Sequence, residues 1–176
     1  MEIGFRLHDT MAYVKEAVGA CGSQEAYAQA WEYVFVFASG KPNTFNPIAD
    51  VRNIYGGKPR KFAPKSETMG TRTHRDVMVA ERGKRTNVWH YHTGICSQDD
   101  RTHHPAQFPE KLARDHILSW SNEGDIVLDP FNGSGTTTKM ARLMGRRFIG
   151  VEVNPDYCEI ARRRLAQKLL DFGDAG

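Results

Sequence analysis

Residues 127–165 decide the fold, and they read VLDPFNGSGTTTKMARLMGRRFIGVEVNPDYCEIARRRL. The apolar run 125–129 is typical of a short buried strand. The apolar periodicity behind the glycine-rich loop predicts a helix that Gly145 ends. Residues 148–152 predict the next strand, and Asn154, followed by a proline, predicts the capped start of a last helix. This order is a βαβ unit, so we expect parallel strands and a right-handed crossover.

The loop between these two strands is where we expect a ligand. Gly133 and Gly135 lack Cβ atoms where the backbone must turn and approach a ligand at the carboxyl end of a strand. Glu152 ends the next strand, where a carboxylate can accept hydrogen bonds from both hydroxyls of a ribose. These residues predict a nucleoside-containing cofactor, and a tight βα turn is the structural alternative for the glycines. Thr138 stands where a dinucleotide fingerprint requires a third glycine, and the glycine spacing of a P-loop is missing.

Further elements precede this unit. Residues 11–16 and 31–38 are rich in aromatic and β-branched types and predict strands, the second apolar enough to be buried on both faces. Residues 43–103 lack sustained periodicity, and we expect an inserted, loop-rich lobe there, because so long a structureless connection is implausible inside a compact core. Apolar residues recur at helical spacing behind Pro109 and Glu110.

The basic residues are concentrated in one region. The net charge is only +3, but residues 51–92 hold ten Lys/Arg against three acidic residues, a net +7, which leaves −4 for the remainder. A basic lobe on an acidic body favours a polyanionic partner such as nucleic acid. A solvated loop region is the alternative.

The composition narrows the class of protein. The 176 residues with 40% hydrophobic content suffice for one domain with a core, and no membrane span or signal sequence is visible. Three widely spaced cysteines fit free thiols, so we expect a soluble cytoplasmic protein. The histidine-rich stretch 90–104 lacks the paired ligand spacing of structural zinc sites, and we expect no metal.

Five segments resemble the DNA amino-methyltransferases, which transfer a methyl group from S-adenosylmethionine to N6 of adenine or N4 of cytosine. HPAQFPEKLARDHI (104–117) and the block 125–165 are similar to the C-terminal half of the family's circularly permuted group. GFRLHDTMAYVKE (4–16), WEYVFVFASGKPNTFNP (31–47) and TNVWHYHTG (86–94) are similar to other family segments. The resemblance therefore covers nearly the whole chain.

The resemblance implies an α/β fold, namely the doubly wound, Rossmann-like sheet of S-adenosylmethionine-dependent methyltransferases, N-terminally truncated and with an inserted loop-rich basic lobe. Within a single domain 1–176, residues 1–42 would be N-terminal strands of the catalytic half, 43–103 the target-recognition lobe and 104–176 the cofactor-binding βαβ region. The implied activity is site-specific methylation of double-stranded DNA, as in restriction-modification systems.

The resemblance also implies the site residues. Glu152 would bind the ribose hydroxyls, and Asn154 would lie near the adenine of S-adenosylmethionine. The other implied cofactor contacts are Asp129, Phe131, Gly133, Ser134, Gly135 and Thr136, with His104, Pro105, Phe108 and Pro109 closing the other side of the pocket. The structural alternatives are that Pro105 and Pro109 only start a helix and that Phe108 belongs to the core. The implied DNA contacts in the basic lobe are Arg60, Lys61, Arg72, Arg75, Arg82, Lys84 and Arg85. Trp89 and Tyr91 could stack on bases or serve as buried anchors.

No catalytic residue is predicted in these 176 residues. The family's catalytic tetrapeptide has Asp, Asn or Ser, then Pro-Pro, then an aromatic residue, and in the permuted order it precedes GFRLHDT. Asn154-Pro155-Asp156-Tyr157 has Asp in place of the second proline, and its position just past Glu152 predicts a helix cap. Three explanations remain open: a fragment of a longer enzyme, one half of an enzyme whose second chain carries the catalytic motif, or a remnant that only binds DNA or S-adenosylmethionine.

Overall fold

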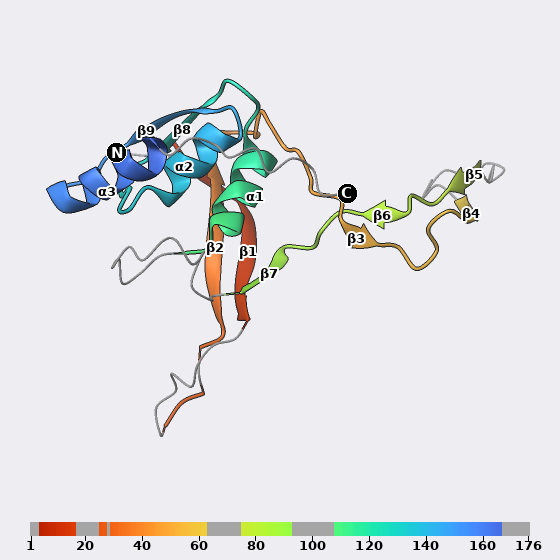
Figure 1. Ribbon diagram of the computed structural model, residues 1–176. Coiled ribbons are helices and arrows are strands. Elements are labelled where there is room, and N and C mark those ends of the chain that lie inside the picture. Colours follow the sequence, from red (N-terminus) through yellow and green to blue (C-terminus); the bar gives the residue numbers. More distant parts are fainter. Residues whose placement is uncertain (1–3, 17–24, 28, 63–74, 93–107, 167–176) are drawn as a thin grey trace. The chain divides into compact units, whose positions relative to one another are not determined.

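A computed structural model describes residues 4–16, 25–27, 29–62, 75–92 and 108–166 (Figure 1). The chain divides into two compact units. Unit 1 comprises Met1–Asn46 and Asn87–Gly176, and unit 2 comprises Pro47–Thr86. Unit 2 is shorter than the insertion predicted for 43–103, because residues 88–92 form a strand of the unit 1 sheet.

Unit 1 contains a three-stranded sheet in the order β2-β1-β7. β1 (Arg6–Glu16) pairs antiparallel with β2 (Trp31–Ala38) and parallel with β7 (Val88–His92). The strand predicted at 31–38 is confirmed to the residue, and the one predicted at 11–16 forms the second half of β1.

One helix covers one face of this sheet. α1 (Glu110–Trp120) begins directly behind Pro109, as predicted, and the ring of its His116 lies 4.6 Å from the ring of Trp89. The Tyr91 hydroxyl donates a 2.8 Å hydrogen bond to the buried carboxylate of Asp115. Trp89 and Tyr91 are both buried, so of their two predicted roles the structure shows the buried anchor.

The opposite face of the sheet carries a row of exposed aromatic rings. Side chains alternate along a strand, so Trp31, Tyr33, Phe35 and Phe37 of β2 share one face, and each is between 42% and 62% exposed. Neighbouring rings in the row contact one another. The prediction that 31–38 is buried on both faces is therefore wrong for the described part of the chain, because no described helix packs over the aromatic rings.

The predicted βαβ unit follows α1. β8 (Ile126–Asp129) and β9 (Arg147–Gly150) are parallel and are joined by α2 (Thr136–Leu143), and α3 (Pro155–Ala166) comes last. Gly145 follows α2 with φ +73°, and Arg146 N–H bonds back to Ala141 O at 2.8 Å, which is the predicted glycine end. Ala113 and Ile117 of α1 pack on Met140 and Ala141 of α2 to form the core that joins this unit to α1.

Two asparagines of unit 1 hold the chain at the points where it leaves for unit 2 and returns. The Asn46 side-chain amide donates to Leu118 O and Ser121 O, each at 3.2 Å. Asn87 donates from its side chain to Thr10 O at 2.8 Å and accepts from Ala12 N–H at 2.9 Å. Both ends of the insertion are thereby bonded to unit 1.

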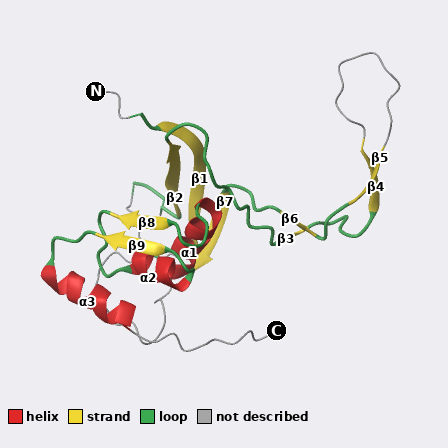
Figure 2. Cartoon of the chain, turned by 90° about the horizontal axis from the view of Figure 1, so that it is seen from above, coloured by secondary structure: helices red, strands yellow, loops and turns green. Residues whose placement is uncertain are grey.

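Unit 2 consists of two short antiparallel ribbons that follow one another along the same pair of chain segments (Figure 2). β3 (Val51–Arg52) pairs with β6 (Arg82–Gly83), and β4 (Pro59–Phe62) pairs with β5 (Arg75–Met78). The loop-rich lobe predicted from the lack of periodicity is thus a two-stranded arm with very short strands.

Burial lowers the pKa of His116 below its ordinary value near 6.5, and the charge of Asp115 opposes this only in part. Around pH 6 the unfolded chain therefore binds more protons at this position than the folded chain does. We predict that the free energy of unfolding decreases as pH falls from 7.5 to 5.5 and that His116→Phe, which keeps a ring against Trp89, reduces this decrease. Denaturant titrations at several pH values measure it.

The control for this prediction is His8→Gln, because His8 is an exposed histidine whose ring lies 5.6 Å from that of Trp120, the last residue of α1. This variant distinguishes the loss of the buried imidazole at His116 from the loss of any histidine. An undiminished pH dependence in His116→Phe would contradict the assignment.

Candidate cofactor-binding site

The glycine-rich loop after β8 is fixed by hydrogen bonds to the end of β9. Asn132 N–H donates to Val151 O at 2.9 Å, and Val151 N–H donates to Asp129 O at 2.9 Å. The Asp129 carboxylate accepts from Phe131 N–H at 3.0 Å and so turns the chain at the start of the loop. The chain's own hydrogen bonds therefore fix the shape of the loop.

Glu152 joins both sides of the site. Its Oε2 accepts a 2.8 Å hydrogen bond from Gly133 N–H, and its Oε1 accepts one of 2.8 Å from Asn154 N–H. The two bonds fix the carboxylate beside the loop, at the carboxyl end of the parallel strands. Each carboxylate oxygen can accept more than one hydrogen bond, so this position suits the predicted recognition of two ribose hydroxyls.

The glycines of the loop have packing reasons as well. Gly133 and Gly135 have φ of +49° and +82°. A Cβ atom on Gly135 would lie 2.9 Å from the Cβ of Ala161 in α3, too close for any side chain. At Gly150, which follows in β9, a Cβ would lie 2.7 Å from Cγ of Asn132, so the Asn132 side chain would have to move. The tight-turn alternative is therefore true of Gly135, whether or not the loop also binds a ligand.

The buried side chain of Arg164 in α3 supports the loop, and the sequence did not predict this role. Arg164 of α3 donates from Nη1 to Ser134 O at 2.8 Å, to Ser134 Oγ at 3.0 Å and to Thr136 Oγ1 at 3.2 Å. Its Nη2 lies 2.7 Å from Oε1 of Glu110, which Lys139 also contacts at 2.7 Å. The hydroxyls of Ser134 and Thr136 are thus buried and bonded to Arg164, so any cofactor contact by these residues would come from the backbone.

Asn154 is the cap of α3. Its Oδ1 accepts from Asp156 N–H at 2.9 Å, and its carbonyl accepts from Cys158 N–H at 3.1 Å. This confirms that Asn154-Pro155-Asp156-Tyr157 starts a helix. The proximity of Asn154 to an adenine stays a prediction.

Of the four residues predicted to close the other side of the pocket, the structure describes two. Pro109 is buried at the start of α1, whereas Phe108 is exposed. His104 and Pro105 lie outside the described residues. Phe131 in the loop is 88% exposed, which leaves its ring available to a ligand.

The predicted DNA contacts of unit 2 differ in their surroundings. Arg60, Lys61, Arg82 and Lys84 are exposed, whereas Arg85 binds the Asp50 carboxylate through Nε at 2.8 Å. Arg85 therefore fastens the two chain segments at the start of the arm. Arg72 and the side chain of Arg75 lie outside the part that the structure describes.

The described part of the chain contains neither a metal cluster nor a membrane-spanning helix. No group of three His, Cys, Asp or Glu side chains there could hold a metal ion. No described helix is long and apolar enough to cross a membrane. Cys96, His103 and His104, which belong to the histidine-rich stretch, are outside that part.

We predict that Arg164→Ala lowers the free energy of unfolding by roughly 1–3 kcal/mol, because it leaves buried oxygens of the loop without a donor. Denaturant unfolding measures the loss. The control is Arg163→Ala on the same helix, whose side chain is 71% exposed and should matter by less than about 0.5 kcal/mol. Equal losses in the two variants would show that Arg164 does not support the loop.

Comparison with known proteins gives close relatives. The protein family described as DNA methylase matches residues 1–163. Orphan methyltransferase M.BamHII of Bacillus amyloliquefaciens is 46% identical over 175 residues, which are 96% of this chain and 66% of that protein. Type II methyltransferase M.HpaI of Haemophilus parainfluenzae is 33% identical over 150 residues, 83% of this chain and 48% of that protein. The chain thus spans about half to two-thirds of the length of these relatives.

Solved structures give the same fold. The crystal structure of the M1.HpyAVI-SAM complex aligns with a TM-score of 0.60 and 26% identity over 94% of this chain and 65% of that one. The cytosine-N4-specific PvuII DNA methyltransferase aligns with a TM-score of 0.61 and 19% identity over 96% of this chain and 54% of that one. The predicted methyltransferase fold is confirmed by these likenesses.

Proposed function

Because the chain belongs to the DNA methylase family, we propose that it is the cofactor-binding and DNA-recognising part of a cytoplasmic DNA methyltransferase. The reaction would transfer a methyl group from S-adenosylmethionine to N6 of adenine or N4 of cytosine at a specific site. The observation that carries this proposal is the Glu152 carboxylate, held by two backbone N–H groups at the carboxyl end of β9 beside the glycine-rich loop.

The residues around Glu152 fit S-adenosylmethionine. The remaining lone pairs of the carboxylate would accept from the ribose hydroxyls, with Asn154 close to the adenine. Asp129 and the backbone of 133–136 would border the methionine part, and the exposed ring of Phe131 would cover it. His104, Pro105, Phe108 and Pro109 would close the other side. When bound, the cofactor supplies a methyl group on a positively charged sulfur, which is a good leaving group.

Unit 2 would hold the DNA. Lys and Arg side chains that neutralise phosphates supply most of the sequence-independent affinity of DNA-binding proteins. The exposed cations Arg60, Lys61, Arg82 and Lys84 suit this role, together with Arg72 and Arg75 from their positions in the sequence. We assign Arg85 to the structure of the arm instead, because Asp50 already pairs with it.

The acceptor amine requires groups that these 176 residues do not supply. An exocyclic amine donates its lone pair into the ring, so an enzyme must accept hydrogen bonds from the amine hydrogens and hold the flipped base against an aromatic ring. The sequence contains no two consecutive prolines and hence no tetrapeptide of the family type. We assign this role to a further part of the enzyme, in the same polypeptide or in a second chain.

The exposed apolar face of unit 1 supports that assignment. Besides the aromatic row of β2, Ile126 and Leu128 of β8 and Ile149 of β9 are more than half exposed on the face of their sheet away from Val127 and the core. Sheets with parallel strands are ordinarily covered on both faces. A further part of the methyltransferase that packs on these side chains would complete the fold. The alternative is a remnant that only binds DNA or S-adenosylmethionine.

Glu152 gives the test of the cofactor site. We predict that Glu152→Gln weakens binding of S-adenosylhomocysteine by at least about 1.5 kcal/mol, roughly tenfold, because hydrogen bonds to a charged acceptor are lost. Calorimetric titration measures it. The wild-type chain should also bind the 2′-deoxy form of this ligand more weakly, whereas the variant should hardly distinguish the two forms.

The control variant for this titration is Glu159→Gln, whose carboxylate is exposed on α3. It should bind as the wild type does. If Glu152→Gln keeps the wild-type preference for the 2′-hydroxyl, Glu152 does not bind the ribose.

Activity needs a complementation test. The chain is mixed with a separate polypeptide that carries the part of the Bacillus amyloliquefaciens relative left unmatched, together with unmethylated DNA and methyl-labelled S-adenosylmethionine. We predict label in DNA from the mixture and none from either part alone, and the chain with Glu152→Ala is the matched control. Label incorporated by this chain alone would contradict the missing acceptor site. Two parts that associate without incorporating label would favour the remnant.

A further inference from the structure

Unit 2 has the dimensions of an element that DNA admits. It is only two strands wide, because β3 pairs antiparallel with β6 and β4 pairs antiparallel with β5. The major groove of DNA accepts an α-helix or a two-stranded β-ribbon, and the edges of the base pairs are distinguishable there. An arm of this width can therefore present side chains to bases as well as to phosphates.

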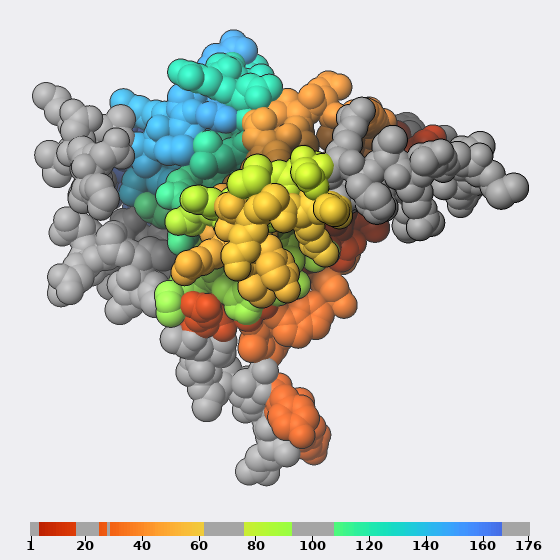
Figure 3. Space-filling model, turned by 90° about the vertical axis from the view of Figure 1, so that its right-hand side faces the viewer, coloured from red at the N-terminus to blue at the C-terminus, as the bar shows by residue number. Residues whose placement is uncertain are grey.

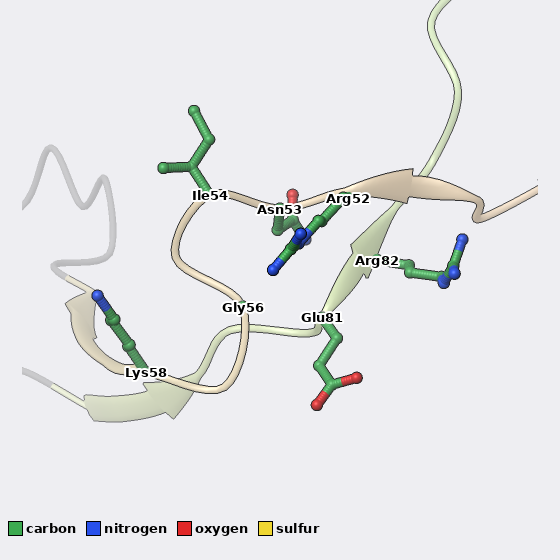
Figure 4. A pocket seen from close by; sticks show the side chains of 7 residues that line it. All are labelled: Arg52, Asn53, Ile54, Gly56, Lys58, Glu81 and Arg82. Carbon is green, nitrogen blue, oxygen red and sulfur yellow. The ribbon is translucent and has the colours of Figure 1, made fainter.

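A bulge between the two ribbons gives the arm a shaped recess. Gly57 N–H donates to Val79 O at 2.9 Å and Asn53 N–H to Glu81 O at 2.9 Å, while Gly56 N–H turns back to Asn53 O at 3.0 Å. A Cβ atom on Gly56 would lie 2.7 Å from Cα of Glu81, so only glycine lets the two segments approach here. The bulge borders a pocket of about 740 Å³ lined by Arg52, Asn53, Ile54, Gly56, Lys58, Glu81 and Arg82 (Figure 4).

Two like charges face each other across the ribbon at this pocket. Arg52 and Arg82 are direct cross-strand partners, an arrangement that destabilises a ribbon unless something else compensates it. Arg82 donates to Asp50 O at 3.1 Å and points away from the middle of the pocket, whereas Arg52 extends toward it (Figure 4). Within the described ranges no carboxylate pairs with Arg52, in contrast to Arg85.

An acceptor lies at the edge of the pocket. Glu81 lines the pocket from the other segment, is exposed and extends away from Arg52 (Figure 4), and no cation of the described part forms an ion pair with its carboxylate. A site for a phosphate alone would not contain an exposed carboxylate, because the two charges repel. Arginine and glutamate together match the two members of one base pair: the guanidinium fits O6 and N7 of guanine, and a carboxylate accepts from the N4 amine of cytosine.

We propose that the pocket at the bulge of unit 2 reads base edges in the major groove of duplex DNA, with Arg52 contacting guanine and Glu81 contacting cytosine. This rests on the proposed DNA-methylating function and names the residues that determine its sequence preference. Lys58 and Arg82, at the two ends of the pocket, contact the flanking phosphates. The exposed surface of the arm (yellow and yellow-green) faces the viewer in Figure 3.

The test is a selection of bound sequences from a pool of random-sequence duplexes by the full chain, followed by sequencing. Arg52→Lys keeps the charge but loses the planar fork that grips guanine. We expect the wild type to prefer guanine at one position and Arg52→Lys to lose that preference, by roughly 5- to 150-fold, with retention of total DNA unchanged. Glu81→Gln should relax the preference at the same base pair, and an unchanged preference there would overturn base reading by Glu81. Lys58→Ala is the control, because it should weaken binding to all sequences equally.

The outcomes separate this inference from the function on which it rests. Arg52→Lys selecting the wild-type sequences overturns base reading by Arg52, and so does a wild-type chain that retains DNA without any preference. A wild-type chain that retains no DNA overturns the proposed function of unit 2 itself. The unfolding temperature of each variant is measured as a control, and a value equal to that of the wild type would show that the exposed substitutions leave the arm folded.

Discussion

The buried guanidinium of Arg164 makes the hydrogen bonds on which the candidate cofactor site depends. It belongs to α3, yet its hydrogen bonds end on the glycine-rich loop, on the first residue of α2 and on Glu110 at the start of α1. Its five N–H groups in a rigid plane let one side chain connect three elements at fixed angles, which a lysine could not do. Gly135 makes these hydrogen bonds possible, because the absence of its Cβ lets α3 come close enough for Arg164 to reach the loop.

The second constraint is the sharing of Glu152. Its carboxylate receives one N–H from the loop and one from the start of α3, so the residue predicted to recognise the cofactor also sets the distance between the two segments that border the pocket. Glu152 therefore has a structural role in addition to its proposed role in recognition. A ligand that bonds to Glu152 adds to hydrogen bonds already present and does not need to organise a mobile carboxylate, which reduces the entropy lost on binding.

Local sequence patterns predicted the helices and strands near the site. They could not predict interactions between residues that are far apart in the sequence. The strand, helix, strand order, the glycine that ends α2 and the Asn154 cap all follow from neighbouring residues, and each is present. Arg164 could not be singled out, since its partners are 28 to 54 residues away and an arginine in the run of three reads as a solvated face. The same limit explains β7, whose five residues alternate between buried and exposed but lie within a stretch without sustained periodicity. The sequence likewise could not show that Arg85 pairs with Asp50 whereas Arg52 forms no ion pair among the described residues.

The asparagines at the two ends of unit 2 have an evolutionary consequence. Asn46 and Asn87 close the unit 1 side of the insertion with hydrogen bonds to β1 and α1, and of the forty residues between them, Pro47–Thr86, none that the structure describes belongs to the core formed by α1 and α2. A segment inserted in this way can be exchanged for another between the same two asparagines while the cofactor pocket keeps every one of its bonds. Under the proposed function, sequence preference and methyl-donor binding would then be free to diverge at different rates, and proteins with the same pocket could mark different DNA sites.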